Sequence, residues 1–233
     1  MLADREFQPT RTPFDLSRYQ TSYEIGRAAV VRRLIPAGRG GSALDIGCGP
    51  GYYTRMLSEK GWRTTAIDTD PQNIESARSH ADETRVGDAA GLLASLPESG
   101  FELALALEII EHMPKAHGGE LLKNIARTLK PDGLLLLSTP NRFSIEGLSG
   151  SWGEKMAGWK KWDAWDQTHV HIYSSHEILT LLKLSGFFIR RVIGVHYKGH
   201  FPLIGSWGLP LNASGTFPLN RLGFNIIVEC GKR

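Results

Sequence analysis

Short apolar runs alternate with helix-like segments along the chain from residue 15 to residue 138. Strands that alternate with helices in this way pair in parallel, and the helices cover both faces of the sheet. We therefore expect an α/β fold with a doubly wound, mostly parallel sheet. The expected strands are 42–46, 63–67, 84–86, 101–107 and 133–138, and the expected helices are 15–35, 52–60, 71–79, 108–113 and 118–129.

The pattern changes after residue 139, where a helix at 175–185 and strands at 186–195 and 222–230 are expected. Residues 140–172 are rich in tryptophan, and residues 198–220 form an expected loop of high apolar content. We expect both segments to fold together at the carboxyl ends of the strands, as a cap that shapes an acceptor pocket. The alternatives are plain packing of a lid and peripheral contact with a membrane surface. The tryptophans concerned are Trp152, Trp159, Trp162, Trp165 and Trp207.

The length and charge of the chain favour one soluble domain. The 233 residues carry a net charge of +3 with scattered basic pairs, so nucleic acid is not an expected partner. Two cysteines, one of them in a glycine-rich turn, favour a reduced cytoplasmic compartment. No signal peptide and no membrane-length apolar run are visible. We expect residues 1–233 to divide into a helical segment (1–40), a cofactor-binding core (41–139) and the cap, with the oligomeric state left open.

Residues 43–51 read ALDIGCGPG, and this stretch joins an expected strand to an expected helix. Glycine at positions 47, 49 and 51 permits a tight turn and lets a bound molecule approach the backbone closely. A glycine-rich turn alone is also compatible with a plain strand-to-helix connection. Cys48, inside the turn, is interpreted as a small filler and not as a nucleophile.

Acidic residues at the ends of three expected strands separate these two interpretations. Asp45 lies near the end of the first strand, Asp68 ends the second strand 23 residues later, and Asp88 follows the third. A carboxylate in the place of Asp68 accepts hydrogen bonds from a ribose diol. A carboxylate in the place of Asp88 receives an adenine amino group. The three residues together describe a nucleoside site.

On these residues the chain resembles the class I S-adenosylmethionine-dependent methyltransferases, most strongly over about residues 40–140. The resemblance implies a Rossmann-like, seven-stranded sheet and S-adenosylmethionine as the cofactor. It implies that the glycine turn passes under the methionine part, that Asp68 holds the ribose and that Asp88 meets the adenine. Asp45 would orient the turn or meet the methionine amino group through water. The cofactor contacts expected on this basis are Asp45, Gly47, Cys48, Gly49, Gly51, Asp68, Thr69, Asp88, Ala89, Glu108 and Tyr23.

Two further stretches resemble particular subgroups of this family. Residues 101–113 read FELALALEIIEHM and residues 129–142 read LKPDGLLLLSTPNR, as in the ubiquinone-biosynthesis O-methyltransferases and the small-RNA 2′-O-methyltransferases. The resemblance implies that Glu108, Glu111 and His112 bind a divalent metal such as Mg²⁺. On a helix these positions share one face, and two carboxylates with one imidazole suit such an ion. In metal-free relatives the same stretch only caps or solvates the helix.

A histidine from the segment after the fifth strand is expected to complete the metal site. Residues 168–171 read THVH, in which His169 fits the spacing of the small-RNA subgroup best and His171 is the alternative. The expected metal ligands are therefore Glu108, Glu111, His112 and His169. The histidines His112, His169 and His171 are also the candidates for a base that removes a proton from an acceptor hydroxyl.

These observations favour an enzyme that transfers a methyl group from S-adenosylmethionine to a hydroxyl of a small molecule. A catechol, a quinol or a sugar diol would suit the site, with or without a metal. The alternatives are 2′-O-methylation of a terminal RNA ribose, N- or C-methylation of a small molecule, and a cofactor-binding protein without turnover. The weak net charge and the lack of a recognisable RNA-binding module count against the RNA alternative.

Overall fold

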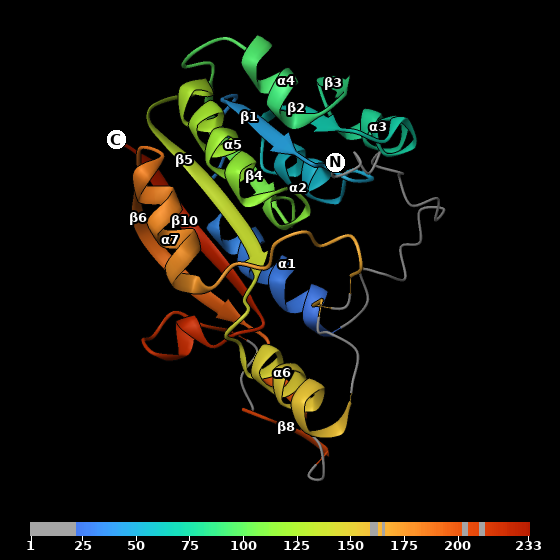
Figure 1. The fold of residues 1–233 in the computed structure, drawn as a ribbon. Coiled ribbons are helices and arrows are strands. Elements are labelled where there is room, and N and C mark those ends of the chain that lie inside the picture. Colours follow the sequence, from blue (N-terminus) through green and yellow to red (C-terminus); the bar gives the residue numbers. More distant parts are fainter. Residues whose placement is uncertain (1–21, 159–162, 165, 202–204, 210–212) are drawn as a thin grey trace, which may run out of the picture.

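The computed structural model describes residues 22–158, 163–164, 166–201, 205–209 and 213–233. A sheet of eight strands forms its centre (Figure 1). The strands are β1 (Ser42–Ile46), β2 (Arg63–Asp68), β3 (Glu83–Val86), β4 (Phe101–Leu107), β5 (Leu129–Pro140), β6 (Phe187–Val195), β9 (Ala213–Ser214) and β10 (Asn225–Lys232). In space they lie in the order β3-β2-β1-β4-β5-β10-β6-β9.

The order of the strands reverses at the middle of this sheet. β1 pairs in parallel with β2 on one side and with β4 on the other. The chain runs outward from β1 through β2 to β3, and only then crosses to β4 and β5. Open α/β sheets bind their ligands beyond the carboxyl ends of the strands at such a reversal. The expected binding edge therefore lies next to Ile46 and Leu107, the last residues of β1 and β4.

The expectation of a doubly wound, mostly parallel sheet is confirmed. β1 to β5 are parallel, whereas β10 is antiparallel to both of its neighbours, β5 and β6. Seven of the eight strands are the expected ones. The eighth, β9, adds only two residues beside β6 at the edge of the sheet.

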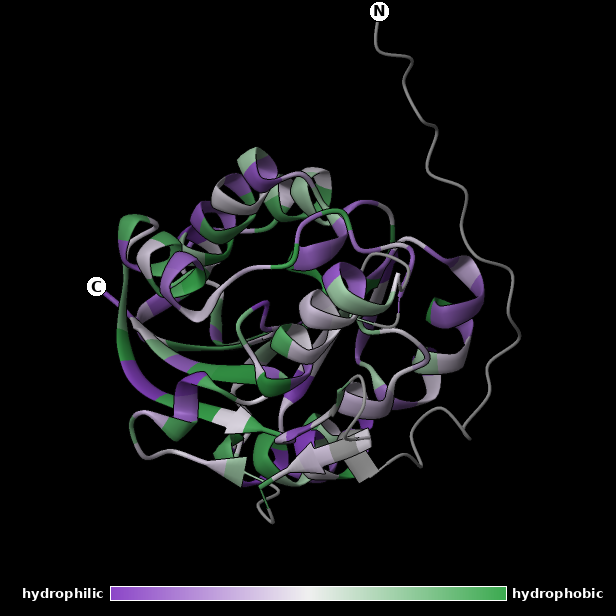
Figure 2. Cartoon of the chain, turned by 60° about the horizontal axis from the view of Figure 1, so that its bottom comes forward, coloured by the Kyte–Doolittle hydropathy of each residue, from purple (hydrophilic) through white to green (hydrophobic). Residues whose placement is uncertain are grey.

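Helices cover both faces of the sheet (Figure 1). The side chains of α1 and α2 pack on one face, and those of α4, α5 and α7 pack on the other. In Figure 2, which is coloured by hydropathy, the central strands are mainly hydrophobic, whereas the outer helices carry both hydrophobic and hydrophilic residues. The helices are α1 (Ser22–Leu34), α2 (Tyr52–Glu59), α3 (Pro71–Ala77), α4 (Ala89–Ser95), α5 (Lys115–Thr128), α6 (Ile145–Ala157) and α7 (Ser175–Leu184).

The sequence of β4 explains how one strand serves two cores. Side chains alternate between the faces of a strand. Ala104 and Ala106 belong to the core beneath α4, α5 and α7, whereas Leu103 and Leu105 belong to the core beneath α1 and α2. The strand is buried on both faces, which accounts for its nearly continuous apolar sequence.

Local capping chemistry fixes where the helices that border the site begin. The Asp70 side chain accepts a hydrogen bond from the Gln72 amide, and Pro71 occupies the first turn of α3. Ser174 and Glu177 form a reciprocal capping box at the start of α7. Both signals are local in sequence, which is why the starts of these helices could be predicted.

The segments that follow β5 form a small unit of their own. α6 packs against a two-stranded ribbon of β7 (Lys198–Phe201) and β8 (Gly205–Gly208). Figure 1 shows this unit projecting beyond the end at which β5 stops. α6 and β7 approach each other closely, since a Cβ atom added to Gly199 of β7 would lie 2.8 Å from Ser149 Oγ of α6. Parts of the two expected cap segments therefore fold together.

Two predictions from the sequence were wrong, one after β4 and one after β6. Residues 108–113 do not form a helix, because only the 3₁₀ turn η3 (Ile110–His112) forms after β4. Glu108 precedes that turn with a left-handed backbone, φ +57°, which an α-helix does not tolerate. Residues 198–220 are not a plain loop, since they contain β7, β8 and β9. The predicted helix at 15–35 is seen as α1 from Ser22, and its earlier residues lie outside the described part of the chain.

Candidate active site

The glycine turn connects β1 to α2 through three residues with positive φ. The angles are +65° at Gly47, +52° at Gly49 and +92° at Gly51. A Cβ atom added to Gly51 would lie 2.7 Å from the Cα atom of Ala77, so α3 packs directly on the turn. Cys48 is buried, and burial raises the pKa of its thiol, which fits the interpretation of a neutral filler.

Asp68 braces this turn from the end of β2. Its Oδ2 atom accepts a hydrogen bond from the Gly49 amide at 2.8 Å, and its Oδ1 atom accepts one from the Asp70 amide at 2.9 Å. The carboxylate is only half-buried, and Thr69 beside it is exposed. Asp68 therefore links the glycine turn to the second strand and still borders solvent at the binding edge.

Asp45 lies beneath the turn and is almost completely buried. Its Oδ2 atom accepts a hydrogen bond from the Thr54 hydroxyl at 2.7 Å. Burial raises the pKa of Asp45 to about 7, although the Thr54 hydrogen bond opposes the shift. This carboxyl group fastens β1 to α2, and it takes up a proton near neutral pH.

Asp88 occupies the position expected at the end of β3. Its carboxylate caps α4 by accepting hydrogen bonds from the amides of Ala90 at 2.8 Å and Gly91 at 3.2 Å. The residue is exposed, and Ala89 is the first residue of α4. The capping role explains why an acidic residue is favourable here. A contact with adenine remains a prediction.

Glu108 does not join the other residues of the expected metal site. Its carboxylate accepts hydrogen bonds from the Ser138 hydroxyl and the Asn225 side-chain amide, each at 2.6 Å. Its second oxygen forms an ion pair with Arg27 of α1 at 2.8 Å. Glu108 thus ties α1 to β5 and β10.

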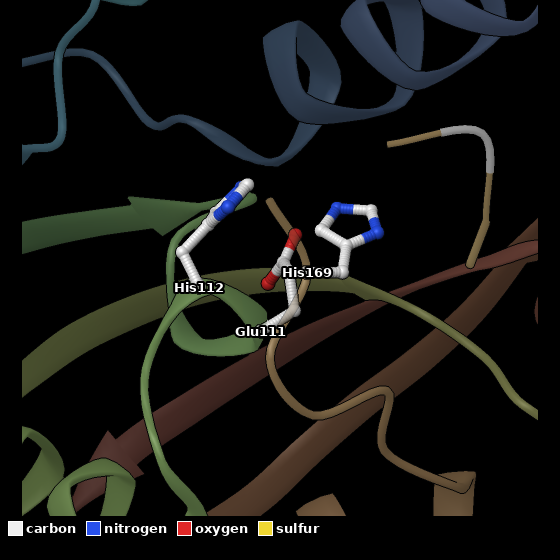
Figure 3. Close-up of side chains that lie close together, drawn as sticks. All are labelled: Glu111, His112 and His169. Atoms are coloured by element: carbon white, nitrogen blue, oxygen red, sulfur yellow. The ribbon is translucent and has the colours of Figure 1, made fainter. Parts of the chain in front are cut away.

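Glu111, His112 and His169 converge within the described part of the chain. One possible ligand atom from each of the three lies within 4.8 Å of the others. Figure 3 shows the Glu111 carboxylate between the two imidazole rings, with His169 approaching from a different segment than η3. The His112 and His169 rings lie 4.8 Å apart, centre to centre.

The environment of Glu111 is unusual for a carboxyl group. Its side chain is fully buried, and its Oε2 atom accepts a hydrogen bond from Thr139 at 3.0 Å. Its Oε1 atom is buried and has no hydrogen-bond partner among the described residues. Burial raises the pKa of Glu111 well above its usual range, and the charge of Glu108 adds to the effect. Burial also lowers the pKa of His112, and His169 lowers it further, which favours the neutral imidazole.

The main chain of Glu111 brings His169 to the cluster. The Glu111 carbonyl accepts hydrogen bonds from the amides of Val170 at 2.8 Å and His171 at 3.0 Å. His169 therefore lies beside η3. The side chain of His171, the alternative histidine, instead packs on Tyr173 with the ring centroids 4.5 Å apart. The structure thus brings together three of the four expected metal ligands and one of the two candidate histidines of the later segment.

Some residues around the site had no place in the sequence-based prediction. Thr168 contacts His112, and Asp166 accepts a hydrogen bond from Thr168. Arg27, Ser138 and Asn225 hold Glu108. The spacing of Asp166 and Thr168 is typical of a side-chain-stabilised turn, which is the only local signal among them. Tyr23 lies in α1, but its side chain is outside the described part, as are Trp159, Trp162 and Trp165.

Comparison with known proteins shows to which family this chain belongs. A model of the methyltransferase domain family matches residues 18–192. A ubiquinone biosynthesis O-methyltransferase from Parvibaculum lavamentivorans is 31% identical over 215 residues, which cover 88% of this chain and 78% of that protein. The chain belongs to the class I S-adenosylmethionine-dependent methyltransferases.

Other relatives carry the same name but align over shorter lengths. The ubiquinone biosynthesis O-methyltransferase of Caulobacter vibrioides is 38% identical over 142 residues, 58% of this methyltransferase and 53% of that protein. That of Maricaulis maris is 32% identical over 66% of this methyltransferase and 62% of that protein. The methyltransferase thus matches little more than half the length of these two relatives.

Solved structures show the same fold. An S-adenosylmethionine-dependent methyltransferase from Thermotoga maritima has a TM-score of 0.65 and 20% identity, and the match covers 93% of this chain and 94% of that one. A methyltransferase from Archaeoglobus fulgidus also reaches 0.65, at 19% identity over 93% and 97% of the two chains. At this identity the likeness concerns the fold alone.

The comparisons confirm the predicted fold and the assignment to the methyltransferase family, whose cofactor is S-adenosylmethionine. The roles of single residues stay predictions at this point. Among the described residues of the methyltransferase, no helix combines the length and the apolar character needed to span a membrane.

Proposed function

We propose that this methyltransferase transfers the methyl group of S-adenosylmethionine to a hydroxyl of a small acceptor such as a catechol, a quinol or a sugar diol. The observation that carries the proposal is the convergence of Glu111, His112 and His169 just after β4. Ile109 in the same connection packs against Gly47, where an added Cβ atom would lie 2.9 Å from Ile109 Cγ2. The cluster thus adjoins the glycine turn. The names of the relatives support an oxygen acceptor.

The cofactor is proposed to bind across the carboxyl ends of β1, β2 and β3. Gly47, Gly49 and Gly51 would pass under its methionine part, and Asp68 would accept hydrogen bonds from the ribose hydroxyls. Asp88, already fixed by the α4 amides, would meet the adenine edge. The other predicted contacts are Asp45 and Cys48 at the turn, Thr69 after β2, Ala89 at the start of α4, Glu108 after β4, and Tyr23 of α1, whose side chain lies outside the described residues.

The donor atoms of the cluster fit a divalent cation. Two imidazoles and a carboxylate are ligands that such ions accept. The buried Glu111 Oε1 atom, with no hydrogen-bond partner among the described residues, is the kind of orphaned polar atom that a bound cation would satisfy. We therefore propose Glu111, His112 and His169 as its protein ligands. A cation there supplies positive charge that lowers the pKa of a nearby hydroxyl.

The reaction itself needs little chemistry from the protein. The acceptor oxygen forms a bond to the methyl carbon while the carbon–sulfur bond breaks, and S-adenosylhomocysteine leaves as a neutral thioether. The hydroxyl proton leaves the acceptor and passes to a base or to water. The protein contributes alignment of oxygen, carbon and sulfur and a site that favours the ionised oxygen.

A test of this function uses the whole chain with S-adenosylmethionine and a catechol, and measures S-adenosylhomocysteine formation. We expect turnover that a chelator abolishes and that added Mg²⁺ or Mn²⁺ restores. Calorimetric titration with Mn²⁺ should show binding to the wild-type protein and none to His112→Gln. The matched control is His171→Gln, which alters a nearby histidine outside the cluster and should keep binding and turnover. Full turnover after exhaustive chelation would refute the metal site, and transfer only to amines or carbon acids would refute the oxygen acceptor.

We also propose that the α6 face meets an anionic lipid surface. Leu148, Trp152 and Met156 follow one another at intervals of four residues and are exposed on α6, with Met156 at 70%. At about 100° per residue, Lys155 lies beside this stripe and Glu154 lies on the opposite side of the helix. An apolar stripe flanked by a positive charge suits an interface with anionic headgroups.

Co-sedimentation with vesicles that contain anionic lipid tests this contact. The double variant Trp152→Ser/Met156→Ser should lose binding to them. The control Leu184→Ser removes an equally exposed apolar side chain from α7, which lies on another part of the surface, and should bind as the wild type does. Equal binding by all three proteins, or no binding by the wild type, would contradict the proposal.

A further inference from the structure

Each histidine of the Glu111–His112–His169 cluster has one ring nitrogen occupied by another group of the protein. The Nδ1 atom of His112 lies 2.9 Å from the Thr168 hydroxyl oxygen. The Nδ1 atom of His169 lies 2.7 Å from the main-chain oxygen of Asp163. In a neutral imidazole one nitrogen donates and the other accepts. The partner of Nδ1 therefore decides what Nε2 can do.

The tautomer of His169 follows directly from its partner. A carbonyl oxygen can only accept a hydrogen bond, so His169 donates from Nδ1 to Asp163. Its Nε2 atom then keeps a lone pair. The cluster receives from His169 a nitrogen that can accept a proton or bind a cation, and no N–H group.

The partner of His112 is the Thr168 hydroxyl, and a hydroxyl can either donate or accept a hydrogen bond. The other contact of this hydroxyl decides which of the two it does toward His112. The Thr168 hydroxyl lies 2.6 Å from Asp166 Oδ1, and the Thr168 amide donates to the same oxygen at 2.8 Å. Asp166 Oδ1 thus accepts both the amide and the hydroxyl hydrogen bond of Thr168.

The single proton of the Thr168 hydroxyl is thus committed to Asp166. The hydroxyl oxygen of Thr168 then presents a lone pair to His112. The hydrogen bond between them is therefore donated by His112 Nδ1 and accepted by Thr168. If the proton pointed at His112 instead, two oxygen lone pairs would oppose each other at 2.6 Å.

We propose that Asp166 and Thr168 are positioning residues that hold His112 with its proton on Nδ1, so that its Nε2 lone pair serves the Glu111–His169 cluster. The inference rests on the proposed function in so far as it takes this cluster as the acceptor-facing group. The opposite tautomer would present an N–H group, which can neither accept a proton nor bind a cation. Asp163, Asp166 and Thr168 thus set the tautomers of both histidines.

The tautomer can be measured without any acceptor. Two-bond ¹H–¹⁵N correlation spectra of the chelator-treated, ¹⁵N-labelled protein report which ring nitrogen of a histidine carries the proton, and His112→Gln identifies the signals of His112. We expect a proton on Nδ1 and none on Nε2. Thr168→Val removes the hydroxyl at similar size and should increase the Nε2–H form. Thr168→Ser keeps the hydroxyl and should keep the wild-type pattern.

Two results overturn the proposal: a wild-type His112 protonated on Nε2, or a pattern that Thr168→Val leaves unchanged. The wild-type spectrum decides by itself if Thr168→Val does not fold. Because no acceptor is needed, a failure to methylate any hydroxyl would remove the proposed function without changing the outcome of this test.

Kinetics supply a second readout. Thr168→Val should lower kcat by about 10- to 100-fold, the usual effect of removing a partner of a site histidine. Its affinity for S-adenosylhomocysteine should equal that of the wild type, and Thr168→Ser should restore kcat. A parallel loss of cofactor affinity, or no rescue by serine, would show a merely structural role and would also overturn the assignment.

Discussion

Gly47 and Ile109 are in direct contact, and a Cβ atom added to Gly47 would lie 2.9 Å from Ile109 Cγ2. Gly47 is the first residue of the glycine turn after β1, and Ile109 lies between β4 and the turn that carries Glu111 and His112. The contact couples the proposed cofactor site to the proposed acceptor site. A substitution of Gly47 should therefore affect both the cofactor site and the acceptor site.

Gly47→Ala should destabilise the protein by about 2–3 kcal/mol, because a strained backbone and overpacking against Ile109 add together. It should also weaken S-adenosylhomocysteine binding about tenfold, equivalent to about 1.4 kcal/mol. Urea unfolding and calorimetry measure the two effects. The control is Gly40→Ala, where φ is +80° and no atom lies within 4 Å of an added Cβ. Gly40→Ala should lose only about 1 kcal/mol of stability, from backbone strain alone. Equal losses of stability in the two variants would contradict the overpacking against Ile109.

Asp68→Ala should weaken S-adenosylhomocysteine binding by about 1.5–3 kcal/mol, because a charge-assisted hydrogen bond to the ribose is lost. Loosening of the Gly49 amide contributes to the loss. Calorimetry checks the value. Asp70→Ala, which removes the cap of α3, should cost about 1 kcal/mol of stability and leave binding unchanged. An unaltered affinity in Asp68→Ala, with the fold intact, would remove Asp68 from the site.

Arg27→Met should destabilise the protein by about 3 kcal/mol, because it leaves the Glu108 carboxylate without its cation in a mostly buried place. The two side chains are only 9% and 21% exposed. Arg32→Met is the control, since its ion pair with Glu59 is long, at 3.7 Å, and exposed. That variant should change stability by less than about 0.5 kcal/mol. Chemical unfolding of both variants measures the difference, and similar small losses would show that Arg27 does not anchor α1.

The raised pKa of Asp45 predicts a pH dependence of stability. Its pKa is about 7 in the folded protein and 3.8 as the ordinary value. The folded state therefore binds the proton more tightly than the unfolded chain does. Proton binding by Asp45 therefore stabilises the folded state. This contribution has its full value below about pH 4 and is lost as the pH rises to 7.

Asp45→Asn does not titrate and keeps an oxygen that can accept from Thr54. Relative to this variant, the wild type without cofactor should lose on the order of 2–3 kcal/mol between pH 5 and pH 8. Urea unfolding at these two values measures the change. Parallel pH profiles of the two proteins would show that Asp45 is already ionised at pH 5.

Much of the fold could be predicted because its signals are local. Apolar runs, the glycines at 47, 49 and 51, and the acidic residues near the ends of three strands lie within short stretches of sequence. A parallel α/β sheet then places these strand ends at one edge, whatever the distant residues are. The glycine turn and the place of Asp68 at the end of the neighbouring strand were thus determined by the sequence itself.

The composition of the cluster was decided only by the tertiary structure. Local spacing predicted that Glu108 and Glu111 would act together, but Glu108 is held by Asn225, 117 residues away in sequence, and by Arg27 of α1. His169 and His171 differ little in sequence context. The main-chain hydrogen bonds to Glu111 and the packing of His171 on Tyr173 separate them. Ion pairs and ring contacts between distant segments form only when the sheet has assembled, so no local pattern encodes them.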